Sequence, residues 1–133
     1  MIAGMRWHRL ALLLALAGCG GGGTCPQIGC VSELVVQLPA GTTAGTACVA
    51  EVCTSAITGG ELRVPLSRRG DDETAAVTVT LPGRAQPFAG EVPLDRTRPN
   101  GRSCPPVCVN GTARVDAASG QVVAVPAPDA ASS

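Results

Sequence analysis

The stretch Ala75-Ala76-Val77-Thr78-Val79-Thr80-Leu81 decides the fold that the sequence predicts. Apolar and hydroxyl side chains alternate along it, so its valines and leucine share one face and its threonines share the other. Successive side chains of a β-strand point to opposite faces, and a period of two therefore indicates a half-buried strand. We expect the valines in a core and the threonines in water.

Six further segments continue this alternation, with turn residues between them. We expect strands over residues 32–38, 46–54, 61–66, 88–94, 107–117 and 121–125, and the segment 46–54 is either a continuous strand or a hairpin. Pro65 predicts an edge strand, because proline has no N–H to donate to a neighbouring strand. Phe88, the only phenylalanine, is expected in the core, and the proline-rich segment 95–106 is expected to cross one end of the fold irregularly. No segment shows the apolar stripe of a helix, so the predicted class is all-β.

Seven short strands at this spacing favour a small sandwich of two packed sheets, with a small β-barrel as the alternative. The layout resembles immunoglobulin-like or carboxypeptidase-regulatory-like domains. This resemblance implies an architecture only. The core tryptophan and corner tyrosine of a true immunoglobulin domain are missing, and a shared fold does not imply a shared function.

Cysteines are expected to staple this domain, because a core of valine, leucine and alanine buries little area per residue. Six cysteines follow Cys19, and an even number of cysteines in an exported chain predicts disulfides, here three. Six thiols allow fifteen connectivities. A two-residue turn at Ala50-Glu51 would set Cys48 opposite Cys53, so this pair is predicted first. For the rest, local pairs Cys25–Cys30 and Cys104–Cys108 are expected, and the alternative is a long bridge from Cys30 to one of the later two.

The N-terminal segment has the pattern of an export signal. Arg6, His8 and Arg9 precede a short apolar run, which ends in Leu16-Ala17-Gly18-Cys19. The run is too short to span a bilayer. The segment resembles a bacterial lipoprotein signal peptide, with Met1 or Met5 as the start, and ordinary secretion is the alternative. The resemblance implies that residues 1–18 are removed, that Cys19 carries a diacylglyceryl lipid, and that the protein is anchored to a membrane of the cell envelope.

The domain boundaries follow from this reading. Residues 19–24 form a glycine-rich tether, residues 25–125 the β domain, and residues 126–133 a disordered tail rich in proline, alanine and serine. The glycines at 18–23 also match the spacing of a dinucleotide-binding loop. Such a loop needs a strand before it and a helix after it, so a flexible tether is the better interpretation.

Composition disfavours several function classes. Beyond residue 18 the chain has no His, Trp, Tyr or Met, and thus lacks the commonest general base, the commonest metal ligand and most stacking platforms. Beyond residue 18 the chain has eight arginines and ten acidic residues, and the arginines do not form a basic stripe. No nucleic-acid partner is therefore expected. The cysteine spacings do not suit zinc, and no Cys-x-x-Cys redox motif is present, so no metal or other cofactor is expected.

The remaining motifs have simpler explanations. Arg69-Gly70-Asp71 resembles an integrin-binding tripeptide but is also an ordinary charged turn, and the acidic run 71–73 lacks the spaced oxygens that calcium requires. Asn110-Gly111-Thr112 matches a glycosylation acceptor but is more simply a turn or a bulge within a strand. Paired carboxylates could in principle act in catalysis, and most sit at outward strand positions: Glu33, Glu51, Glu61, Glu91, Asp95 and Asp116.

The sequence therefore predicts a lipid-anchored envelope protein that binds another protein or serves as a structural accessory, and not an enzyme. One alternative is a small secreted enzyme or inhibitor that uses the 95–106 loop. A second alternative is a solute-binding module, although such receptors need a ligand cavity.

Overall fold

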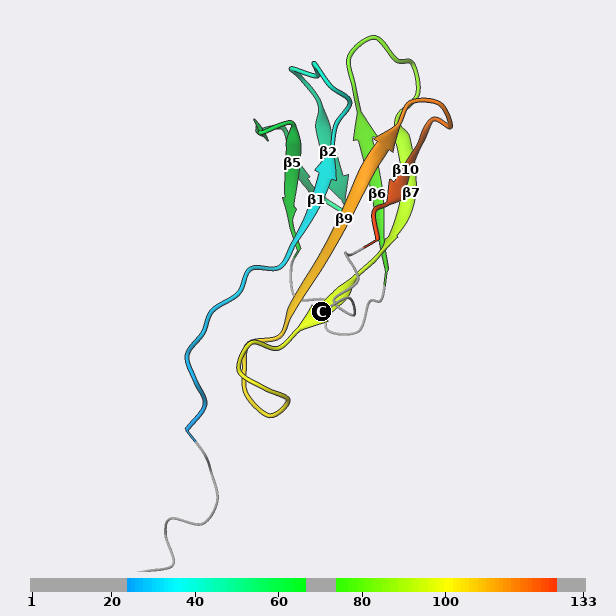
Figure 1. Ribbon diagram of the computed structural model, residues 1–133. Helices are drawn as coiled ribbons and strands as arrows, with labels where there is room; N and C mark the ends of the chain where they lie inside the picture. Colours follow the sequence, from blue (N-terminus) through cyan, green and yellow to red (C-terminus); the bar gives the residue numbers. More distant parts are fainter. Residues whose placement is uncertain (1–23, 67–73, 127–133) are drawn as a thin grey trace, which may run out of the picture.

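The computed structural model of the chain describes residues 24–66 and 74–126, and every regular element within them is a β-strand (Figure 1). The predicted all-β class is confirmed. Burial alternates strictly along β6, as the pattern at 75–81 predicts. The strands are β1 (Glu33–Gln37), β2 (Thr46–Val49), β3 (Val52–Thr54), β4 (Ile57–Thr58), β5 (Glu61–Pro65), β6 (Thr74–Thr80), β7 (Phe88–Pro93), β8 (Asp95–Thr97), β9 (Cys108–Asp116) and β10 (Gln121–Ala124).

These strands form one mixed sheet in the order β3-β2-β6-β7-β10-β9-β1-β5-β4, and β8 also pairs with β9. β1 runs parallel to β9, and β7 parallel to β10, whereas the other pairs are antiparallel. The sheet curls until β2 and β3 contact β5, which makes a half-barrel. The expected sandwich of two separate sheets is wrong, because the pairing of Ala89 with Gln121 joins its two halves.

More strands are present in the described residues than the seven expected, for local reasons. The segment 46–54, expected as the cysteine hairpin or as one continuous strand, forms the hairpin and so contributes both β2 and β3. β4 forms next to the Gly59-Gly60 turn, outside the strands that were expected. The 95–106 segment was expected to be irregular throughout, yet it begins with β8, which pairs along the first three residues of β9.

The core lies inside the curl. It consists of the inward residues of both halves of the sheet, and Phe88 is buried within it as predicted. Small side chains dominate the remainder of the core: Leu34, Val36, Ala47, Leu62, Val64, Ala75, Val77, Val79, Val92, Ala113, Val115 and Val122. Arg84 covers the ring of Phe88 from outside, with its guanidinium carbon 4.2 Å from the ring centroid.

Two glycines permit the closure of the half-barrel. A Cβ on Gly90 of β7 would overlap the backbone of Val122 in β10. A Cβ on Gly111 of β9 would lie 2.8 Å from Cδ1 of Leu34 and 2.9 Å from Cδ2 of Leu94, where the chain passes from β7 to β8. Glycine lets the backbones approach closely at both places. The Asn110-Gly111-Thr112 motif therefore lies within a strand, and its glycine serves packing.

Cys48 is joined to Cys53 across the β2–β3 hairpin, with their Cα atoms 4.1 Å apart. The two residues are direct partners in the hairpin register, which is the geometry that the sequence predicts. The turn at Ala50-Glu51 contains neither glycine nor asparagine. Ala50 instead adopts a φ of 52°, in the left-handed region that L-residues with a Cβ rarely occupy.

The other two disulfides are long-range. Cys25 is bonded to Cys104, and Cys30 to Cys108, over sequence separations of 79 and 78 residues. The expected local pairs Cys25–Cys30 and Cys104–Cys108 are therefore wrong, and the alternative long bridge from Cys30 is the one found. The reason is topological: β1 runs parallel to β9, so the chain before β1 lies beside the chain before β9.

Pro65 occupies an open edge of the sheet. β4 pairs only with Glu61 and Leu62 of β5, so the last residues of β5 have no strand on that side. Proline is tolerated there because no donor is needed. The described residues contain no helix that is long and apolar enough to cross a membrane.

Candidate functional site

An open groove lies beside β9, where two other strands leave part of it uncovered. β8 pairs with the start of β9, up to Asn110, and β10 pairs with its second half, from Ala113 onward. Between these two partners, Gly111 and Thr112 line a groove of about 630 Å³, and the backbone O of Thr112 accepts a hydrogen bond from the backbone N of Val125 at 2.9 Å. The gap exists because β7 pairs with β10 only near its start, at Ala89, and the chain then passes through Leu94 to β8, which pairs with β9.

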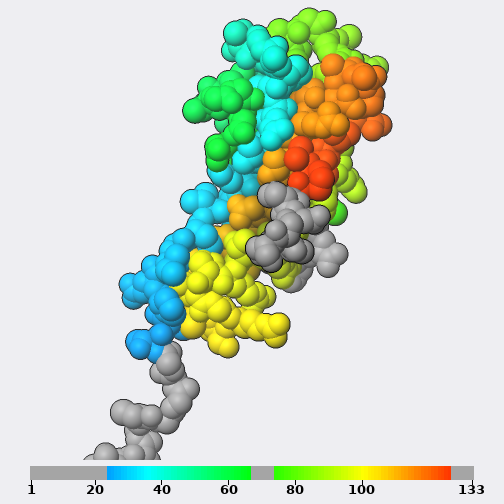
Figure 2. All heavy atoms as spheres, viewed as in Figure 1, coloured from blue at the N-terminus to red at the C-terminus, as the bar shows by residue number. Residues whose placement is uncertain are grey.

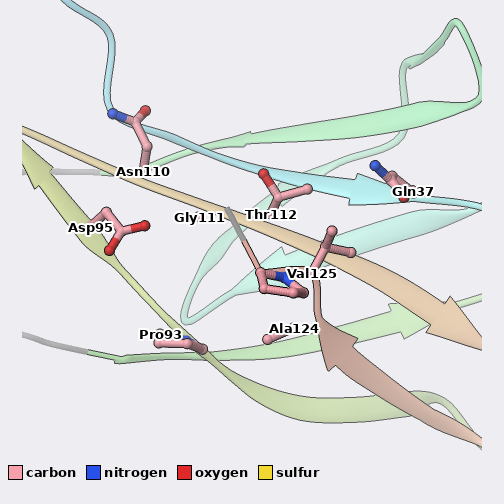
Figure 3. Close-up of a pocket in the computed structure, with 9 residues that line it drawn as sticks. Gln37, Pro93, Asp95, Asn110, Gly111, Thr112, Ala124 and Val125 are labelled. Carbon is pink, nitrogen blue, oxygen red and sulfur yellow. The ribbon is translucent and has the colours of Figure 1, made fainter. Parts of the chain in front are cut away.

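The lining of this groove combines neutral hydrogen-bonding groups with apolar ones. Figure 3 shows Gln37 and Thr112 on the adjacent strands β1 and β9, with Asp95 beside Asn110. Asp95 and Asn110 are direct partners in the β8–β9 register, so their side chains share one face. The rest of the described lining is Pro93, Gly111, Ala124, Val125 and Pro126.

The described lining of the groove contains hydrogen-bonding groups, of which a single one is ionisable. Asp95 carries the only ionisable side chain among the described lining residues. Asn110 is held in place, because its Oδ1 accepts a hydrogen bond from the backbone N of Glu33 at 3.3 Å. One carboxylate provides neither the acid–base pair of glycoside hydrolysis nor a partner for a nucleophile. The groove can bind by hydrogen bonds and apolar contact.

The other candidate carboxylates lie elsewhere and do not line this groove. Glu33 and Glu61 both pair with Arg63, at 2.6 and 3.1 Å, on the outer surface of β1 and β5. Glu91 is on β7, whereas Glu51 and Asp116 lie at the β2–β3 and β9–β10 turns. No group of three or more metal-binding side chains occurs in residues 24–66 and 74–126.

The hydroxyl of Ser119 and the backbone N–H of Ala118 both hydrogen-bond to Asp116 and lower its pKa below the ordinary value. Both donors belong to the turn that follows β9. They favour the ionised carboxylate, and so they fix the β9–β10 turn.

A second feature is the lobe that holds the chain before β1. We call residues 24–32 and 98–107 the clamped lobe. Figure 2 shows the two segments, in blue and yellow, packed against each other at one end of the molecule. Cys25–Cys104 bonds them within the lobe, and Cys30–Cys108 attaches the lobe to β9. Most of the 95–106 loop thus holds the N-terminal segment, and only Asp95 of that loop lines the groove.

Asn100 lies at the centre of the clamped lobe and is buried. Its Oδ1 accepts from the backbone N of Ile28 at 3.0 Å, and its Nδ2 donates to the carbonyls of Ile28 and Pro105 at 2.9 and 2.7 Å. The amide therefore satisfies both backbone groups of Ile28, as a neighbouring strand would. This side chain takes the place of a strand pairing between two irregular segments.

Sequence reasoning identified the cysteines and Asp95 but missed Asn100, Gln37 and Thr112. Asn100 stands between Pro99 and Gly101, which is the signature of an ordinary exposed turn, so nothing local indicates a buried amide. The predicted lipid site Cys19, the tripeptide at 69–71 and the acidic run at 71–73 lie outside the described residues.

Comparison of the chain with models of protein families, with curated proteins and with solved structures finds no match.

Proposed function

We propose that this protein is a lipid-anchored module of the bacterial cell envelope, and that its β9 groove binds a segment of a partner protein. The observation that carries the proposal is the groove itself. It is open, it sits on a disulfide-stapled sheet, and it offers Gln37, Asp95 and Thr112 beside small apolar side chains. Open surfaces of this mixed character suit protein recognition.

The disulfides support the exported location. All six cysteines in the described residues are paired, and disulfides persist in oxidising compartments outside the cytosol. Cys19 precedes the first of them and follows small residues at the end of an apolar run. A lipid on that cysteine would hold the module at a membrane, because two acyl chains give stable anchoring and one chain does not.

Metabolic labelling with a radioactive fatty acid tests the anchor. The wild-type chain is expected to incorporate the label and to fractionate with membranes, and Cys19→Ser is expected to lose both properties. An unlabelled wild-type chain would contradict the anchor. It would not bear on binding at the groove, which photo-crosslinking tests separately.

Site-specific photo-crosslinking in intact cells tests the groove. A photoreactive side chain at Gln37, at the groove, is expected to capture one reproducible envelope protein. Ala124→Arg is expected to abolish that product, because the larger cationic side chain fills the groove lined by Ala124. Ala76→Arg is the matched control, since Ala76 is exposed on the outer face of β6, away from the groove lining. Equal capture in both variants would contradict the proposal.

A further inference from the structure

We propose that the clamped lobe docks on the surface of an anionic lipid bilayer. This inference rests on the proposed lipid anchor, but it concerns a different surface from the β9 groove. It assigns the lobe a role beyond holding the chain, because the lobe would fix how the sheet stands relative to the membrane.

The first argument is the distribution of exposed apolar side chains. Four large hydrophobic residues are exposed in the described part of the chain, and three of them lie in the lobe: Ile28 at 56 %, Val31 at 70 % and Val107 at 39 %. Ile28 also lines a shallow hollow of about 370 Å³ with Pro26, Pro105 and Pro106. Apolar side chains gathered on so small a lobe mark an interaction surface.

The second argument is charge. The lobe contains Arg98 and Arg102 and no acidic residue. The described remainder of the chain contains four arginines and six acidic residues, so its formal charge is 4 − 6 = −2 against +2 for the lobe. A cationic, partly apolar lobe on an otherwise acidic molecule is complementary to anionic lipid headgroups, which attract nearby arginines and repel the acidic sheet.

The third argument is reach. The described chain begins in the lobe at Thr24, and this end of the molecule lies opposite the β6–β7 loop in Figure 1. Thr24 lies five residues after Cys19, so a lipid on Cys19 keeps Thr24 within about 17 Å of the bilayer even if the tether is fully extended. The anchor therefore limits how far the lobe can lie from the headgroups, whereas it sets no such limit on the sheet beyond the lobe.

Tryptophan fluorescence on the acylated full-length protein tests the docking. Trp7 lies in the leader and no other tryptophan or tyrosine exists, so after leader cleavage one introduced tryptophan is the only strong emitter. The protein is reconstituted in vesicles of phosphatidylethanolamine and phosphatidylglycerol with brominated acyl chains. Emission from Val31→Trp is expected to be quenched and blue-shifted. Emission from Gln86→Trp, in the exposed β6–β7 loop, is expected to be unchanged.

A charge variant separates headgroup attraction from accidental contact. In the Val31→Trp background, Arg102→Gln is expected to weaken docking about fivefold, whereas Arg114→Gln on the outer face of β9 is expected to have no effect. An acylated, vesicle-bound protein without quenching would overturn the docking and leave the anchor standing. This is also the result expected if an acidic protein surface covers the lobe in the cell. A chain that is not acylated would overturn both proposals.

Discussion

At the scale of single residues, Asn100 joins the two segments of the clamped lobe. It is a buried polar side chain, and its three hydrogen bonds satisfy groups from two irregular segments. No buried side-chain nitrogen or oxygen in the described residues is left without a partner, so the amide geometry is complete. Removing a fully satisfied buried amide leaves its partners unpaired, which costs more than the bond is worth.

Asn100→Ala is therefore expected to lower the free energy of unfolding by about 2–3 kcal/mol. The loss should be local, because Cys25–Cys104 still joins the two segments. Urea denaturation measures the change in stability, and hydrogen exchange at the Ile28 amide measures its location. Gln27→Ala, at an exposed neighbouring position, is the control. A change below about 0.5 kcal/mol for Asn100→Ala would contradict the role of the amide.

Asp116 gives a pH prediction of known sign. The Ser119 hydroxyl lowers its pKa in the folded state, with the Ala118 amide contributing next. The carboxylate therefore adds stability above the pKa of the unfolded chain, and this contribution is lost as the pH falls through the folded pKa. Ser119→Ala is expected to raise the pKa of Asp116 toward its ordinary value, as measured by NMR titration of the carboxyl carbon. Ser103→Ala should leave the titration of Asp116 unchanged.

At the scale of elements, the junctions between strands determine the closure of the sheet. β7 meets β10 through one register pair, and Gly90 allows their backbones to approach. The crossing from β7 to β8 lies against Gly111 in the same way, although there the nearest atoms belong to the side chains of Leu34 and Leu94. Side chains can move by a few tenths of an ångström, whereas a paired backbone cannot.

Gly90→Ala is thus expected to be more destabilising than Gly111→Ala. Overpacking typically costs about 1–3 kcal/mol, and Gly111→Ala should fall within that range, with Gly90→Ala at or beyond its upper limit. Thermal unfolding of the two variants provides the comparison. Ala89→Gly, a neighbouring exposed position in β7, controls for strand propensity. If Gly111→Ala were more destabilising than Gly90→Ala, the contact at Gly90 would not be the more rigid of the two.

At the scale of the whole molecule, the loops closed by the two long disulfides overlap, because Cys30 lies inside the Cys25–Cys104 loop and Cys108 lies outside it. Each closes a loop of nearly the same span, 79 and 78 residues. Once one is formed, the other closes only the short ring through 25–30 and 104–108, of about ten residues. Their contributions to the entropy of the unfolded chain are therefore not independent.

Replacing either long pair by alanines is expected to cost about 3 kcal/mol in the loop-entropy account, and replacing both about 7 kcal/mol, which is more than the sum of the two. Replacing Cys48 and Cys53 should cost about 2 kcal/mol, because that loop is short. Urea titrations of the wild-type protein and the four variants measure these differences. Strict additivity of the two long pairs would contradict the explanation by overlapping loops.

The sequence by itself determined the properties that depend on neighbouring residues. Alternation with a period of two indicated the all-β class and the inward face of β6, and a two-residue turn placed Cys48 opposite Cys53. These features follow from strand geometry, which depends on a few neighbouring residues and can therefore be recognised in a short stretch of sequence. Phe88 was identified for the same reason, since the most apolar side chain on an inward face enters the core.

Tertiary structure alone decided the features that join distant segments. The parallel pairing of β1 with β9 selected Cys30–Cys108 over any local disulfide, and it placed Gln37 beside Thr112 at one groove. The burial of Asn100 depends on Ile28, which is 72 residues away in the sequence. The two halves of the single curled sheet are joined by the pairing of Ala89 with Gln121, next to the close approach at Gly90. Such contacts depend on which strands become neighbours, and the side-chain pattern within one strand is the same whichever neighbour it acquires.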